Sequence, residues 1–215
     1  GLTVATEQGK VWQRIQTEAT DSPYRWSSMT LDHRFGDNGW GSIGLSRLDE
    51  QRTLLGGRLG DLFQHGGSSS LFFDVEARRN LGNGWSATVM GRRGWTSFGG
   101  GRFQTAAYSF DLAKYGLLGE RDRLGLRVAQ PLRIEKGGIA MMLPTAYDYT
   151  TETETNTLER LSFTPSGREV DGELSYSTSL GKGWLGANLY MRRQPGHIAS
   201  ADADVGAAIR YSLGF

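Results

Sequence analysis

The last eleven residues constrain the fold more than any other segment, because apolar and polar side chains alternate there with period two. From Val205 to Phe215 every odd position is apolar, and every even position is small or polar. A strand of about 9 to 11 residues with one apolar and one polar face fits a tilted path across the hydrocarbon core of a bilayer. The segment therefore predicts the last strand of a transmembrane β-barrel.

The same alternation recurs along the whole chain and predicts one domain over residues 1–215. We expect an all-β fold, a transmembrane antiparallel β-barrel of about 12 strands, which is an even number as in single-chain bacterial barrels. Pro144 lacks a backbone N–H and predicts a bulge in its strand. The expected strands cover residues 8–18, 24–35, 40–49, 70–80, 85–96, 102–113, 122–133, 138–150, 157–165, 169–180, 184–193 and 204–215.

The composition is compatible with such a barrel. The mean hydropathy of −0.43 is low, but only every second residue of a barrel strand faces lipid, so a polar lumen dilutes the average. The longest aliphatic run, Ile139 to Leu143, is far shorter than the ~20 residues of a spanning helix. With no cysteine and a net charge of +1, the chain offers no thiol chemistry and no reason to expect a nucleic acid partner.

Three near copies of one glycine-rich turn mark one side of the expected barrel. They are Phe35–Trp40, Leu81–Trp85 and Leu180–Trp184, and each ends on a tryptophan. Glycine with Asn or Asp supplies the positive φ angles of tight hairpins. We expect the last strand to run inward and to end in the periplasm. Because twelve is an even number, the N-terminus and all three turns are then also expected in the periplasm. The tryptophans are expected at the headgroup level on that side.

Two segments leave alternatives open. Residues 1–20 suit a first strand, but Val11, Trp12, Ile15 and Ala19 also fit one face of a helix, a remnant of a pore helix. We expect a strand, because the next strand needs an outward-running partner. Residues 149–168 contain a Thr/Glu-rich run that either extends a strand or forms a turn.

The polar faces of the strands predict the lumen. An Arg or Lys on the lipid face at mid-depth would cost ~2–4 kcal/mol, which fixes the register. The simplest role for these side chains is to fill and stiffen the lumen. The candidate lumen residues are Asp74, Glu76, Arg78, Arg92, Asp111, Arg127, Asp171, Glu173 and Arg210. The C-terminal Tyr211, Leu213 and Phe215 are the candidate assembly signal, with lipid contact as the alternative role.

The chain offers few candidates for catalysis or metal binding. His33, His65 and His197 lie in different segments without the spacing of a metal site. Asp202 and Asp204 near His197 suit a hydrolase assembled across loops, or a calcium site, but loop acids are usually solvated. We expect no catalytic residue, metal or cofactor in this chain.

A soluble all-β fold is the alternative to a membrane barrel. Lipocalin-like barrels and β-sandwiches also alternate, but they turn the apolar face inward. Alternation alone does not tell which face points in. The preference for a membrane barrel rests on the terminal Phe215 and on the turns that end in tryptophan.

Several motifs resemble one family over roughly residues 40–215. They are residues 122–134, which include Gln-Pro-Leu-Arg, residues 137–149, and Ser166–Glu169, with support from Thr53–Gly56 and Gly91–Trp95. Together they resemble the C-terminal β-domain of subtilisin-like serine-protease autotransporters.

The resemblance implies a twelve-stranded translocator in the bacterial outer membrane. Such a domain takes an N-terminal passenger across the membrane and is inserted by the β-barrel assembly machinery. The implied partners are outer-membrane lipid, that machinery and the chain's own passenger, and the barrel is expected to be a monomer. The chain lacks the helix-rich pattern of a subtilisin domain, so we expect no enzyme in it. A small porin or adhesin and, less favoured, an outer-membrane hydrolase are the alternatives.

Overall fold

A computed structural model describes residues 1–15, 18–57 and 67–213, and it is built almost entirely from β-strands. Eleven strands form one antiparallel sheet. They are β1 (Leu2–Ile15), β2 (Glu18–Phe35), β3 (Gly39–Glu50), β4 (Ser68–Gly82), β5 (Trp85–Phe98), β6 (Gly101–Tyr115), β7 (Arg123–Asp148), β8 (Thr153–Ser162), β9 (Val170–Leu180), β10 (Gly183–Arg193) and β11 (Asp204–Leu213).

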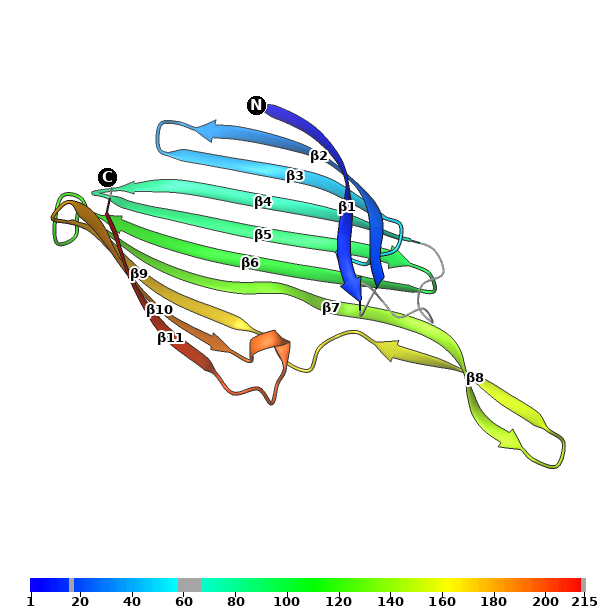
Figure 1. The fold of residues 1–215 in the computed structure, drawn as a ribbon. Coiled ribbons are helices and arrows are strands. Elements are labelled where there is room, and N and C mark those ends of the chain that lie inside the picture. The colour runs from blue at the N-terminus through cyan, green and yellow to red at the C-terminus, as the bar shows by residue number, and fades with distance from the viewer. Residues whose placement is uncertain (16–17, 58–66, 214–215) are drawn as a thin grey trace.

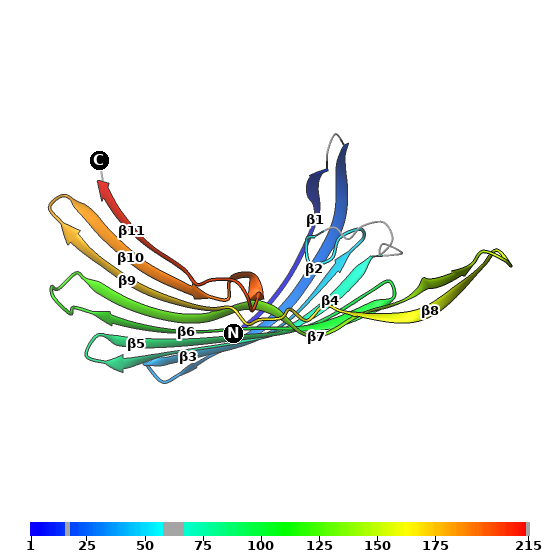
Figure 2. The same cartoon turned by 90° about the horizontal axis from the view of Figure 1, so that it is seen from below.

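The sheet is a meander in which strands adjacent in sequence also pair in space. The order is β1-β2-β3-β4-β5-β6-β7-β9-β10-β11, and β8 pairs only with β7. Figures 1 and 2 show the strands as a curved wall with β1 at one rim and β11 at the other. Within the described residues these two strands have no partner on their outer sides, so the expected closure is not present and the sheet is open.

The first strand settles one open alternative, because Leu2–Ile15 is a strand paired with β2 and not a helix. In the described residues the only helix is a short 3₁₀ turn at Pro195–His197. None of the helices described is long and apolar enough to cross a membrane.

The expectation of twelve strands is wrong at one place, because the expected strands 122–133 and 138–150 form the single 26-residue strand β7. Its first part pairs with β6 and β9, and its far part forms a protruding hairpin with β8. The expected bulge at Pro144 is confirmed by a register shift between Pro144 and Ala146.

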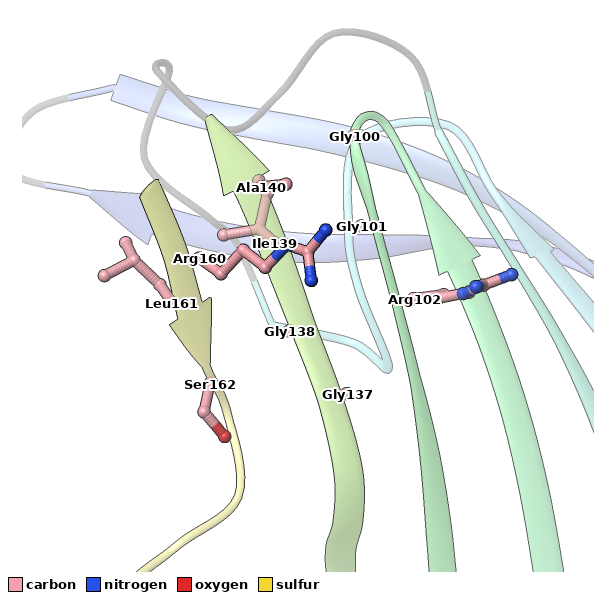
Figure 3. A pocket seen from close by; sticks show the side chains of 10 residues that line it. All are labelled: Gly100, Gly101, Arg102, Gly137, Gly138, Ile139, Ala140, Arg160, Leu161 and Ser162. Carbon is pink, nitrogen blue, oxygen red and sulfur yellow. The ribbon is translucent and has the colours of Figure 1, made fainter. Parts of the chain in front are cut away.

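The glycines that suggested a turn inside β7 serve close packing instead. Gly137 has φ +111°, and a Cβ there would lie 2.3 Å from the carbonyl oxygen of Arg102 on β6. The strand therefore bends past β6 without breaking, as Figure 3 shows around Gly137 and Gly138. A glycine can mark either a turn or a close backbone approach, and here it marks the approach.

The three short glycine turns lie at one end of the sheet, which we call the turn end. They connect β2 to β3, β4 to β5 and β9 to β10. Both chain ends lie at the same end: the backbone N–H of Asp32 donates to the carbonyl of Gly1, and Leu213 pairs with Gly183 beside a turn. We call the opposite end, with the connections after β3, β5, β7 and β10, the loop end.

The two faces of the sheet differ in chemistry and in exposure. One face, the inner face, lies on the hollow side of the curve, and it includes Ser70, Phe72, Thr96 and Thr105, all at most 7% exposed. The other, the outer face, carries apolar side chains that are 40% to 79% exposed. Those side chains are Val4, Met29, Leu31, Ile43, Leu45, Phe73, Val75, Val89, Phe110, Leu126, Leu174, Leu189 and Ile209.

A small aromatic core closes the inner face at the loop end. The ring of Phe98 stacks on that of Phe163 at 5.9 Å between centroids, and Phe103 packs against both. Ile139 on β7 is also buried there. The charged part of the inner face thus lies between this core and the turn end.

The tryptophans of the three turns lie on different faces of the sheet. Trp85 lies on the outer face, because it alternates with Ala87 and Val89. Trp40 pairs with Arg78, and Trp184 alternates with Asn188, so both belong to the inner face. The difference follows from a bulge between Asn80 and Gly82, which is present in only one of the three hairpins.

Candidate functional site

A hollow of about 660 Å³ on the inner face spans six strands, from β3 to β9. Polar and charged side chains line it because the inner-face positions of neighbouring strands are in register. It brings together six of the nine candidate lumen residues. They are Asp74, Glu76, Arg92, Arg127, Asp171 and Glu173.

The two arginines of the hollow pair with acids on neighbouring strands. Arg92 donates to both oxygens of Asp74, at 2.6 and 3.2 Å. Arg127 lies 3.7 Å from Asp111, a seventh candidate. On β10 the amide of Asn188 donates to Glu173 at 2.6 Å. The hollow is therefore hydrophilic, and its lining carries more acids (Asp74, Glu76, Asp171 and Glu173) than cations (Arg92 and Arg127).

The other two candidates lie outside this hollow. Arg78 continues the inner face of β4 towards the turn end, where Trp40 is its register partner. Arg210 lies opposite Gly186 near the rim formed by β11.

The candidate assembly signal lies only partly within the described residues. The hydroxyl of Tyr211 donates to the carbonyl of Leu180 at 2.9 Å, which ties β11 to the β9–β10 turn. Leu213 is the last residue of β11 and is 53% exposed. Phe215 lies outside the described residues.

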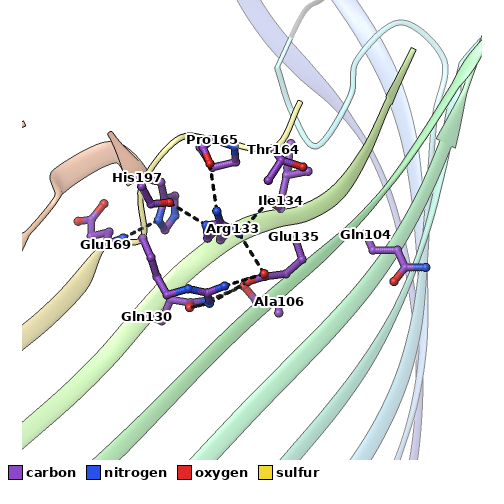
Figure 4. A network of polar contacts seen from close by, with 12 residues as sticks. Gln104, Ala106, Gln130, Arg133, Ile134, Glu135, Thr164, Pro165, Glu169 and His197 are labelled. Carbon is purple, nitrogen blue, oxygen red and sulfur yellow. Dashed lines mark hydrogen bonds and ion pairs between the residues drawn. The ribbon is translucent and has the colours of Figure 1, made fainter. Parts of the chain in front are cut away.

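A polar network at the loop end joins two of the motifs that carried the resemblance, residues 122–134 and Ser166–Glu169 (Figure 4). Arg133 is 8% exposed, and its Nε donates to the carbonyl of Gly167 at 2.9 Å. Its two terminal nitrogens donate to the carbonyl of Pro165 and to Glu135, both at 3.0 Å. One buried guanidinium thus holds residues 165–167 against β7.

Arg168 adds a second layer to the network. It donates to both oxygens of Glu135, at 3.0 and 2.7 Å, and it also contacts the buried amide of Gln130. The hydrogen bond to Glu135 raises the pKa of Arg168 above its usual range. Because Arg133 and Arg168 share one carboxylate, the two motifs act as one structural unit.

Two of the candidate hydrolase residues, His197 and Asp204, make structural contacts. The Nδ1 of His197 accepts the backbone N–H of Glu169 at 2.9 Å, and its Nε2 lies 3.1 Å from the carbonyl of Leu132. Both ring nitrogens are therefore used in holding the 3₁₀ turn to β7 and β9. Asp204 pairs with Arg192 across β10 and β11.

His33 lies on β2 with its ring against Phe35, and His65 falls outside the described residues. No group of three or more His, Cys, Asp or Glu side chains able to hold a metal occurs in the part of the chain that the structure describes. The expectation that the chain has no catalytic role stays a prediction.

Three buried carboxylates, whose structural role the sequence did not predict, hold the connections in place. Glu50 accepts the backbone N–H groups of Leu55 and Gly56, at 2.7 and 2.8 Å. Glu169 accepts the N–H of Gly196 at 2.6 Å. Asp122, 2% exposed, is the third.

Asp122 organises the β6–β7 connection at the turn end. It accepts the N–H groups of Leu117 and Leu118 at 2.7 and 2.6 Å, and the hydroxyl of Tyr176 at 3.2 Å. Desolvation raises the pKa of this carboxyl, but these hydrogen bonds lower it by more, so the net pKa is below the usual value.

Comparison with known proteins gives no match: no family model, no curated protein and no solved structure matches the chain. The functional argument therefore depends on the geometry of the sheet.

Proposed function

We propose that this protein is the membrane wall of a translocator, a β-barrel of the bacterial outer membrane that anchors and exports an N-terminal passenger. The observation that carries the proposal is the division of one sheet into a polar inner face and an exposed apolar outer face. A soluble barrel or sandwich requires the reverse, because its apolar face must be buried inside. Large exposed apolar surfaces are typical of membrane or protein contact.

The open edges of the sheet support a closed form in the membrane. A lipid-exposed strand edge leaves backbone groups unsatisfied, each at a cost of several kcal/mol, so spanning sheets close. β1 and β11 are the first and the tenth strand of the antiparallel meander, so they run in opposite directions. Their edges can therefore pair directly, or through an even number of further antiparallel strands.

The two chain ends suit export through such a barrel. Both lie at the turn end, together with the short connections, and barrels of the outer membrane have short periplasmic turns and longer outside loops. A chain entering from the periplasm at the first strand would meet the paired charges of the inner face. Such a polar lining keeps the path hydrated.

Translocation is tested by fusing a reporter domain ahead of Gly1, behind an export signal, and shaving intact cells with protease. The proposal expects a shaved reporter together with a barrel whose gel mobility changes on heating. A folded barrel whose reporter stays in the periplasm, with and without added upstream sequence, would contradict it.

A small porin is the second candidate, because the same charged hollow also suits a water-filled channel. A channel is expected to conduct ions in a planar bilayer without any passenger, and charge reversal of Arg127 would change its ion selectivity. A translocator is expected to depend on the passenger segment for surface exposure of the reporter.

A further inference from the structure

A second set of hollows lies on the outer face, at the loop end, where the apolar surface stops. One, of about 450 Å³, is lined by Trp95 and Ser97 of β5, Arg102 and Gln104 of β6, and Lys136 of β7. Trp95 pairs with Gln104, and Gln104 pairs with Lys136, so these side chains stand in one row across three strands. The hollow is thus a groove with an aromatic wall and two cations.

The groove continues on the other side of Arg102. A neighbouring hollow of about 670 Å³ shares Arg102 and Gly137 with it and adds Arg160 of β8, as Figure 3 shows. Arg93 borders the row and donates to Gln104 at 3.3 Å. Four cations therefore gather at this part of the outer face.

Cations on the outer face are concentrated at the loop end. Arg25 and Arg47 occupy outer positions of β2 and β3 there, where Asp49 pairs with Arg47 and lies opposite Arg25, and Arg193 does so on β10. At the turn end the outer face carries only Arg79 and Lys114 among the described lysines and arginines of β2 to β11. A phosphate-rich lipid surface at the loop end alone matches this asymmetry.

We propose that the groove of Trp95, Arg102, Gln104 and Lys136 binds the phosphorylated sugar headgroup of an outer-leaflet glycolipid. This rests on the proposed function, because it needs the loop end to face outward in the membrane. The two cations hold the phosphate, Trp95 packs on the sugar ring, and the lipid chains lie along the apolar outer face below. The volume is within the usual range of small-molecule sites, about 300–1,000 Å³.

Lipid A is a suitable probe, in its bisphosphorylated form and after removal of its phosphates. The protein is folded into phosphatidylcholine nanodiscs, and lipid adducts are titrated by native mass spectrometry. The wild type is expected to prefer bisphosphorylated lipid A, and the double variant Arg102→Gln with Lys136→Gln to lose about tenfold or more in affinity, as expected for charge-assisted hydrogen bonds. Arg102→Lys is expected to keep most of it.

The matched control is Arg79→Gln with Lys114→Gln, which removes two outer-face charges at the turn end and is expected to leave the affinity unchanged. Equal binding of dephosphorylated lipid A, or an equal loss in the control, would overturn the inference alone. A wild-type protein that folds but does not enter the bilayer would overturn the proposed function, and this inference with it.

Discussion

Adjacent positions on the same strands belong to two faces of different chemistry. Along β3, Ile43 is 53% exposed on the outer face, while the next inner-face position, Ser42, lines the charged hollow. The change takes a single residue, because successive strand side chains point to opposite faces. Inner-face and outer-face side chains therefore alternate along each strand. The effect of a substitution on stability is expected to depend on the face that carries the side chain.

A buried arginine at an outer-face position is the largest exception to this division, and its removal is expected to have the largest effect. Arg133 lies opposite the outer-face position Ala106 but is buried under residues 165–167. Arg133→Met is expected to lower the free energy of unfolding by about 3–5 kcal/mol, because Glu135 and two carbonyls lose a buried partner. Denaturant unfolding in lipid vesicles measures it.

Arg47→Met is the control, since Arg47 also lies on the outer face but is exposed and pairs only with Asp49 among the described contacts. Its effect is expected to be within ~0.5 kcal/mol. Equal losses of stability in the two variants would mean that the Arg133 network does not stabilise residues 165–167 against β7.

The contrast between the faces is sharpest at neighbouring positions of β3. Ile43→Arg is expected to cost ~2–4 kcal/mol, the penalty for a cation on a lipid face at mid-depth. Ser42→Arg places the same side chain beside Glu76 on the inner face and is expected to be nearly neutral. The same vesicle assay compares them, and a larger cost at Ser42 would reverse the assignment of the faces.

The coupling free energies of ion pairs on the two faces are expected to differ by a smaller amount. Arg92 and Asp74 form a two-pronged pair in the hollow, and their side chains are 49% and 34% exposed. A double-mutant cycle is expected to give about 0.5–1 kcal/mol after screening, against near zero for the outer pair of Arg47 and Asp49. A larger coupling free energy for the outer pair would show that the hollow does not strengthen the ion pairs inside it.

The smallest expected effect is a dependence of stability on pH. It comes from a carboxyl in a connection and not from a residue on either face of the sheet. The pKa of Asp122 in the turn is lowered on folding. Its contribution to stability is therefore present above the unfolded pKa of about 3.9 and is lost as the pH falls through the lower folded value. Asp122→Asn is expected to differ from the wild type at neutral pH, to approach it as the pH falls below about 4, and to converge with it only below the lower folded pKa.

Acid titration of unfolding monitored by circular dichroism follows this convergence. Asp37→Asn, in the β2–β3 turn, is a suitable control at the same end of the sheet. A gap between wild type and Asp122→Asn that persists at low pH would contradict the assigned cause.

The sequence predicted the all-β fold, the turns and the polar faces, because these follow from local alternation and from glycine in tight hairpins. It missed the continuity of β7, since Gly137 is a turn signal and a packing residue alike. It also missed Glu50 and Glu169, because their partners are backbone N–H groups, in one case 27 residues away. Such contacts carry no pattern in the chain.

Two of the motifs behind the resemblance, residues 122–134 and Ser166–Glu169, were each visible in the sequence, but their contact was not. Arg133 and Gly167 lie 34 residues apart and meet through one hydrogen bond. Only the fold, in which β9 returns along β7, brings them together.

The most direct test of the central claim is the environment of single cysteines along β4, which is simple because the chain has no cysteine of its own. Cysteines at positions 73, 74, 75 and 76 are labelled with an environment-sensitive fluorophore in brominated-lipid vesicles. We expect quenching by lipid at Phe73 and Val75, and quenching by an aqueous agent at Asp74 and Glu76. The reverse pattern, or no alternation, would contradict the account.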